Sequence, residues 1–120
     1  QLRDDVAVGC MQIFTRWHAD RFESADHMLE PRNNVYFAAW FLRRLYERHG
    51  TWTEAVGHYH ASTRNKTARR RYVCQVMHHM IRLGHGTVTP SARSYCSGHY
   101  AQYLQAGELD RLRLAARGKR

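Results

Sequence analysis

The sequence contains few of the residues that break secondary structure. Only two prolines and eight glycines occur among its 120 residues, which leaves little room for low-complexity linkers. No stretch approaches the roughly 20 consecutive apolar residues of a membrane-spanning helix. No export signal is visible, and the start at Gln1 rather than Met suggests a processed or trimmed product. A chain of this length is expected to form one domain with one core.

Cysteine is also scarce, at Cys10, Cys74 and Cys96. The odd number is compatible with one disulfide and a free thiol, or with three free thiols. Because no pair has the Cys-x-x-Cys spacing, structural or free cysteines are favoured over zinc ligands. Zinc binding by these cysteines is therefore not predicted.

Acidic residues are outnumbered, ten against 19 basic ones, so the formal net charge is +9. A basic surface suits nucleic acid, an anionic membrane, or a cell-wall polymer with free carboxylates on its peptide stems. The hydrophobic fraction of 43% and the aromatic fraction of 12% favour a folded, mostly helical domain.

Hydrophobic spacing predicts helices after a short extended or turn segment at 8–14. Residues 15–24 are expected to be irregular, with one helical turn. Asp26 is predicted to cap a brief helix that Pro31 stops. The most regular helix is predicted from Asn33 to a left-handed stop at Gly50; its apolar positions are Val35, Ala38, Ala39, Leu42, Leu45 and Tyr46.

The second half has its own helix signals. Thr51-x-x-Glu54 is a capping-box pattern that predicts a helix over 52–60. A second strong helix is expected over 67–83, followed by a connector around Pro90 and two shorter helices near 94–105 and 108–116. We predict a core at 1–83 and a C-terminal helical extension at 84–120, packed on or beside it.

Four segments in order carry a resemblance to a known family. They are Gly9-Cys10-Met11-Gln12-Ile13, Pro31-x-x-Asn34-Val35, the helix reaching Phe41-Leu42, and Tyr59-His60-Ala61. Together, over about residues 8–72, they resemble the soluble lytic transglycosylase domain. The resemblance implies a mainly α, lysozyme-like fold. It also implies cleavage of peptidoglycan glycan strands to a 1,6-anhydro product, in the periplasm or cell envelope, without a cofactor.

The resemblance lacks the residue that the family's chemistry requires. That family uses one Glu, first as acid and then as base, on a helix upstream of the Gly-x-Met-Gln turn. Here eight residues precede Gly9 and none is Glu. Asp4 and Asp5 have no apolar pocket residues around them that would raise a pKa. We therefore expect a partial lysozyme-like domain without a catalytic residue, either a fragment cut downstream of the Glu or a natural non-catalytic relative.

The other carboxylates fit structural roles. Glu23, Glu47 and Glu54 are interpreted as surface, helix-face and cap residues. We accordingly predict glycan binding, or participation in a larger envelope assembly, rather than turnover.

The resemblance places Met11, Gln12, Tyr59 and His60 at the substrate. The alternative for Met11 is a core position, and for Gln12 a bond to a buried backbone group. Phe14 stands where family members commonly have Asn, which removes a polar group near the groove. Tyr59 matches the tyrosine that reaches the acid and the sugar's acetamido group; its alternative is an ordinary buried tyrosine.

Three further assignments concern an asparagine, the cysteines and the paired histidines. Asn34 is interpreted as a structural cap or loop anchor rather than a ligand. If the protein is exported, Cys74–Cys96 is the expected bridge, because Cys10 lies inside the groove motif. The pairs His58-x-His60 and His78-His79 do not share a helix face, which argues against a metal site.

A different function remains open. The run Arg64-x-Lys66-x-x-Arg69-Arg70-Arg71 is usually a solvated helix face, but it could bind nucleic acid or an acidic protein partner. No recognised nucleic-acid module accompanies it, so this hypothesis ranks second.

Overall fold

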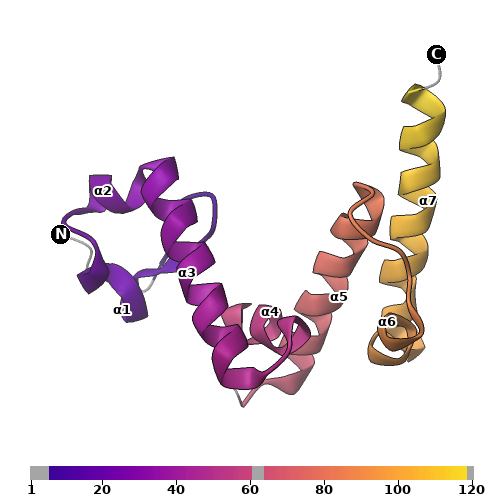
Figure 1. Ribbon diagram of the computed structural model, residues 1–120, viewed down its shortest axis with the longest axis horizontal. Coiled ribbons are helices and arrows are strands. Elements are labelled where there is room, and N and C mark those ends of the chain that lie inside the picture. The colour runs from indigo at the N-terminus through magenta and orange to yellow at the C-terminus, as the bar shows by residue number, and fades with distance from the viewer. Residues whose placement is uncertain (1–5, 61–63, 119–120) are drawn as a thin grey trace. The chain divides into compact units, whose positions relative to one another are not determined.

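A computed structural model describes residues 6–60 and 64–118 (Figure 1). The described chain is mainly helical, as predicted. It forms two compact units, one ending at Gly50 and the other beginning at Thr51. Asp4, Asp5 and Ala61 lie outside the described residues.

The first unit begins with a small antiparallel hairpin. Strand β1 (Ala7–Val8) pairs with β2 (Ile13–Phe14), with Ala7 opposite Phe14 and Val8 opposite Ile13. The inward side chains of Val8 and Ile13 are buried. This hairpin confirms the predicted extended segment.

Short helices follow the hairpin, namely α1 (Thr15–His18), η1 (Ala19–Arg21) and α2 (Ala25–Leu29). The predicted cap at Asp26 is wrong, because the hydroxyl of Ser24 accepts the His27 N–H at 3.1 Å and Asp26 lies inside the first turn. Both residues suit helix starts, and the extended backbone at Ser24 gives it the capping position.

Helix α3 (Pro31–His49) begins two residues before the predicted start at Asn33. The Glu30 carboxylate caps it by accepting the N–H groups of Arg32 and Asn33, at 3.3 and 3.2 Å. Pro31 thus ends α2 and also occupies the first position of α3, where a missing N–H costs nothing. Gly50, at φ 87°, ends the helix in the left-handed conformation, as predicted.

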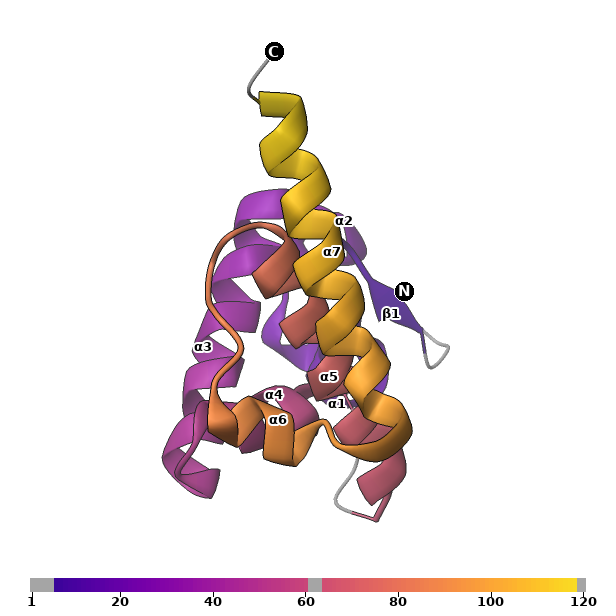
Figure 2. The same cartoon turned by 90° about the vertical axis from the view of Figure 1, so that its right-hand side faces the viewer.

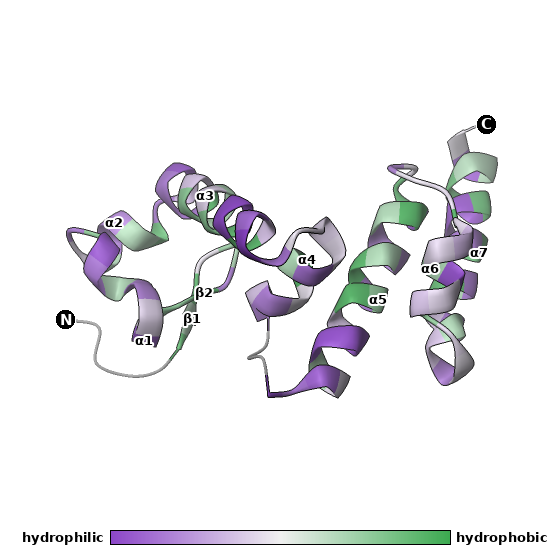
Figure 3. Cartoon of the chain, turned by 60° about the horizontal axis from the view of Figure 1, so that its bottom comes forward, coloured by the Kyte–Doolittle hydropathy of each residue, from purple (hydrophilic) through white to green (hydrophobic). Residues whose placement is uncertain are grey.

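The second unit begins with α4 (Trp52–His60), where the predicted cap is confirmed by a 3.1 Å bond from the Glu54 N–H to the Thr51 hydroxyl. Helix α5 (Lys66–Arg82) is capped by Asn65, whose side-chain oxygen accepts the Ala68 N–H at 2.9 Å. Figure 3 shows that the first turns of α5 are hydrophilic and that hydrophobic residues follow.

The last helices differ from the prediction. Pro90 starts α6 (Pro90–Tyr95) instead of lying in the connector, and η2 (Gly98–Tyr100) leads into one helix, α7 (Ala101–Gly118). The expected break before Glu108 is absent because Gly107 packs directly on α5. A Cβ atom there would lie 2.8 Å from the His78 carbonyl oxygen.

Helices α5 and α7 lie side by side (Figures 1 and 2) and share a core with the segment between them. Its centre is the Cys74–Cys96 disulfide, which confirms the expected pairing and leaves Cys10 free. The other buried members are Ile81, Tyr100 and Leu104. The division between 1–83 and 84–120 stays a prediction.

Candidate functional site

The turn at residues 9–12 is held by one buried side chain, that of Asn34 on α3. Its amide nitrogen donates to the carbonyl oxygens of Val8 and Met28, both at 3.0 Å. Its oxygen accepts the Met11 N–H at 2.9 Å. Asn34 is fully buried, so these bonds replace water for all three backbone groups. The predicted anchor role is confirmed.

Gly9 makes this arrangement possible. Its φ is +77°, which side chains rarely tolerate, and a Cβ atom at this position would collide with the Asn34 amide. The Gln12 N–H then closes the turn on the Gly9 carbonyl oxygen at 3.0 Å. Gly9 therefore allows the backbone of the turn to approach the Asn34 side chain closely.

Met11 and Gln12 lie at the surface of the turn. Met11 is 39% exposed, so it is not a core residue. The Gln12 side chain donates to the Gly9 carbonyl oxygen at 2.9 Å in an exposed bond, and its backbone has φ 52°. Both side chains are thus presented outward on a fixed backbone. Their contact with a glycan stays a prediction.

Tyr59 and His60 end α4 in the second unit. Tyr59 is half-buried. The exposed His60 ring stacks on Tyr72 of α5, with centroids 4.2 Å apart and planes 4° apart. Burial raises the pKa of the Tyr72 hydroxyl, which therefore stays protonated and able to donate. The four predicted site residues fall into two pairs, one in each unit.

Every carboxylate among the described residues is exposed or half-buried. The three weighed above form surface pairs four residues apart. Glu23 lies 3.7 Å from His27, Glu47 3.9 Å from Arg43, and Glu54 3.8 Å from His58. These positions fit surface, helix-face and cap roles, and they do not resemble the apolar pocket of a general acid.

Metal-ligating side chains do not gather in the part of the chain that the structure describes. No group of three or more His, Cys, Asp or Glu residues could hold an ion there. His78 instead pairs with Asp110 of α7 at 3.1 Å, and this bond holds the pKa of the Asp110 carboxyl below its usual value.

Among the described residues no helix is long and apolar enough to cross a bilayer.

One arginine of the basic run is structural. The Arg70 guanidinium donates to the Tyr95 carbonyl oxygen and the Ser97 hydroxyl, both at 2.8 Å, and lies over the Tyr100 ring. The solvated-face interpretation is therefore wrong for Arg70. Nothing in three consecutive arginines indicates that the middle one contacts the end of α6 and the residues that follow it.

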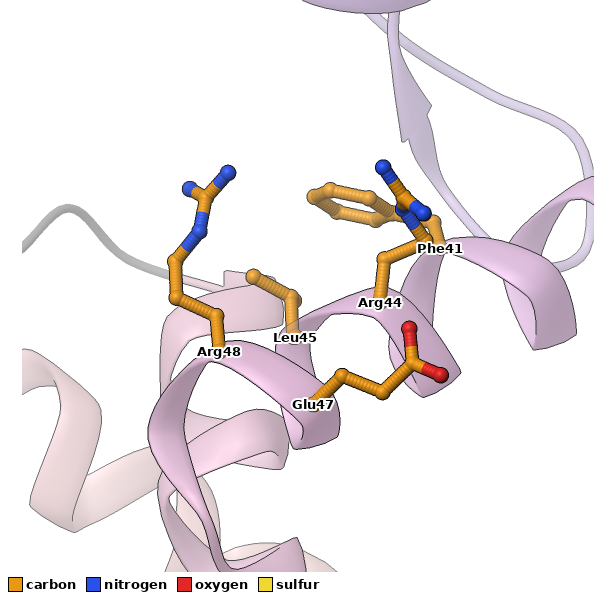
Figure 4. Close-up of a pocket in the computed structure, with 5 residues that line it drawn as sticks. All are labelled: Phe41, Arg44, Leu45, Glu47 and Arg48. Carbon is orange, nitrogen blue, oxygen red and sulfur yellow. The ribbon is translucent and has the colours of Figure 1, made fainter.

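Sequence reasoning missed a cationic surface on the first unit. Arg21 and Arg44 both lie over the Trp40 ring, at 5.0 and 5.6 Å from its centroid. Beside them is a surface depression on α3 (Figure 4), lined by Phe41, Arg44, Leu45, Glu47 and Arg48. The spacing Trp40-x3-Arg44-x3-Arg48, with members one helical turn apart, is a signal that could have found it.

Comparison with known protein families shows to which family the chain belongs. The family model described as the transglycosylase SLT domain matches residues 3–78. The chain belongs to this family. The predicted resemblance is thereby confirmed, and the mainly helical fold agrees with the lysozyme-like domain that it implies. The SLT match includes the Gly9–Gln12 turn, Asn34, Tyr59 and His60. No curated protein and no solved structure matches the chain.

Proposed function

We propose that this SLT domain binds the glycan strands of bacterial peptidoglycan in the periplasm or cell envelope and does not cleave them by itself. Membership of the family supports a peptidoglycan-related function. The observation that carries the proposal is the 9–12 turn, where a buried Asn34 fixes a backbone that presents Met11 and Gln12 outward.

The turn offers a glycan two complementary contacts. The Met11 thioether is polarisable and adapts to an apolar sugar face. The Gln12 amide has further donors and acceptors beyond its bond to Gly9, and these can serve hydroxyl and acetamido groups. Because the turn is already ordered, binding does not carry the cost of ordering it.

Tyr59 and His60 supply a second contact region in the proposal. The stack on Tyr72 holds the His60 ring in one orientation. A flat, exposed ring of this kind suits the face of a sugar, and the half-buried Tyr59 beside it carries a hydroxyl.

Binding is proposed without turnover because no carboxylate among residues 6–60 and 64–118 has the setting of a general acid. Protonating a glycosidic oxygen near neutral pH requires a carboxyl group whose pKa is raised by an apolar site. The described carboxylates lie at the surface and several are paired with cations or histidines.

The test is co-sedimentation with insoluble glycan strands from which the peptide stems have been removed. Wild type should bind. The variant Met11→Ala/Gln12→Ala should bind several-fold more weakly. A second variant, Tyr59→Phe/His60→Ala, tests the second contact region in the same way. Leu112→Ala, exposed on α7, is the matched control and should bind as wild type does. Absence of wild-type binding would contradict the proposal.

The same wild-type protein is also tested for cleavage of peptidoglycan. Chromatography of the soluble fraction after incubation with intact peptidoglycan should show no anhydro-muropeptides. If wild type releases them, the non-catalytic part of the proposal is wrong.

A further inference from the structure

Two guanidinium groups contact the same indole ring, that of Trp40, in the first unit. The Arg21 and Arg44 groups each lie over its ring, and Arg48 follows Arg44 one turn further along α3. We call Arg21, Trp40, Arg44 and Arg48 the arginine–tryptophan cluster. Attraction between a cation and an aromatic face restrains an otherwise flexible arginine, so the donors of Arg21 and Arg44 are partly ordered before any ligand arrives.

The cluster borders an apolar floor. Figure 4 shows the Arg44 and Arg48 side chains rising from the same side of α3 as Phe41 and Leu45. Leu45 is buried and Phe41 half-buried, so the floor is part of the packed unit. A group with a small apolar portion and a negative end matches this combination.

The positive charges are not neutralised within the described part of the chain. There, Arg21, Arg44 and Arg48 form no ion pair with a carboxylate. The carboxylate of Glu47 lines the depression, but it pairs with Arg43 at 3.9 Å. Arg21 and Arg44 over one indole, with Arg48 one helical turn beyond Arg44, therefore form a site that an external anion would stabilise.

We propose that the arginine–tryptophan cluster binds the carboxylates of the peptide stems of peptidoglycan. The proposal rests on the proposed function, and it adds a partner group that the glycan lacks. Planar guanidinium groups bind carboxylates by donating two parallel hydrogen bonds to the carboxylate oxygens. The floor of Phe41 and Leu45 accommodates short aliphatic side chains next to the carboxylate. A phosphodiester would interact with the arginine charges but would leave the apolar floor without a contact.

The experiment compares two polymers from one preparation, intact peptidoglycan and glycan strands without stems, whose freed lactyl carboxylates have been converted to amides. The cluster variant is Arg44→Ala/Arg48→Ala, and the control is Arg71→Ala/Arg93→Ala, which removes two exposed positive charges from the second unit. Circular dichroism and the urea midpoint check that each variant is folded. Double-stranded DNA serves as the phosphate competitor.

Wild type and control should bind intact peptidoglycan about tenfold more tightly than stem-free glycan, because two exposed charge-assisted contacts each contribute a few-fold. The cluster variant should bind both polymers equally, at the wild-type level for stem-free glycan. Added salt should reduce the preference of wild type.

Four results would overturn the inference. If wild type binds the two polymers equally, the glycan proposal stands and the stem proposal fails. If the cluster variant keeps the preference, the carboxylates bind elsewhere. If DNA displaces intact peptidoglycan from wild type and not from the cluster variant, the cluster is a phosphate site. Wild type that binds neither polymer contradicts both proposals.

Discussion

The side-chain amide of Asn34 lies where a Cβ atom at Gly9 would be. The two residues depend on each other: the glycine leaves room for the amide, and the amide bonds the backbone on both sides of the glycine. Two residues that are 25 positions apart thus set the shape of the surface proposed to contact glycan.

Gly9→Ala should therefore be much more costly than an ordinary substitution of a left-handed glycine. Gly50→Ala in the same unit is the matched control, with φ +87° and nothing within 4 Å of the added atom. We expect the control to lose about 1 kcal/mol of unfolding free energy. Gly9→Ala should lose about 3 kcal/mol or more, because the Asn34 bonds are displaced as well. Urea unfolding measures both, and equal losses would mean that the amide moves aside freely.

Asn34→Leu tests the same contact from the other side. Leucine fills a similar volume but leaves the Val8 and Met28 carbonyl oxygens and the Met11 N–H without this partner. We expect a loss of about 3 kcal/mol. Asn33→Ala is the control, since its half-buried amide donates one bond, to the His27 carbonyl oxygen, and should cost about 1 kcal/mol. A leucine variant as stable as the control would contradict the anchor role.

Gly107→Ala should destabilise the protein, although a change from glycine to alanine inside a helix usually stabilises it. Replacing glycine by alanine inside a helix normally stabilises it by up to about 1 kcal/mol. Here the added Cβ would lie 2.8 Å from the His78 carbonyl oxygen, so α7 must move away from α5. We expect a loss of roughly 1–3 kcal/mol. Gly118→Ala at the open end of α7 should be neutral or slightly stabilising. Thermal unfolding of both variants gives the comparison.

His18 should make the first unit less stable in mild acid. Burial against Phe37 and Phe41, and secondarily the charge of Arg21, lower the pKa of this imidazole below 6.5. The unfolded chain therefore binds the proton more tightly. The stability that neutral His18 contributes is complete above about pH 6.5 and falls as the pH drops toward the folded-state pKa.

Urea midpoints at about pH 7.5 and about pH 5.5, on either side of the ordinary imidazole pKa, measure this effect. His18→Phe should reduce the difference between the two midpoints. His85→Gln, exposed after α5, should leave it as in wild type. An unchanged difference in the His18 variant would contradict the assignment.

Local signals predicted most of the fold. The Gly50 stop and the Thr51 cap depend on one or two neighbouring residues, so the sequence is sufficient to place them. The break predicted before Glu108 was wrong because α7 is fixed by the contact of Gly107 with α5, which the local sequence does not reveal. Family resemblance, rather than composition, located the 9–12 turn.

The site was predicted less completely. That Asn34 anchors a turn could be inferred, but its bonds to three separate backbone groups come only from the folded structure. The placement of Arg70 against the α6 segment and of Arg21 over Trp40 depends on residues brought together from distant positions. Charge counting cannot separate such arginines from solvated ones.

The Cys74–Cys96 bridge also makes part of the second unit a closed covalent ring. The exposed segment 83–87, which joins α5 to α6, lies inside this ring. A single protease cut there would leave the chain in two pieces that still migrate as one molecule, with α7 kept on α5. The pieces would separate on a denaturing gel only after a reductant is added, so an unreduced gel would not reveal the cut.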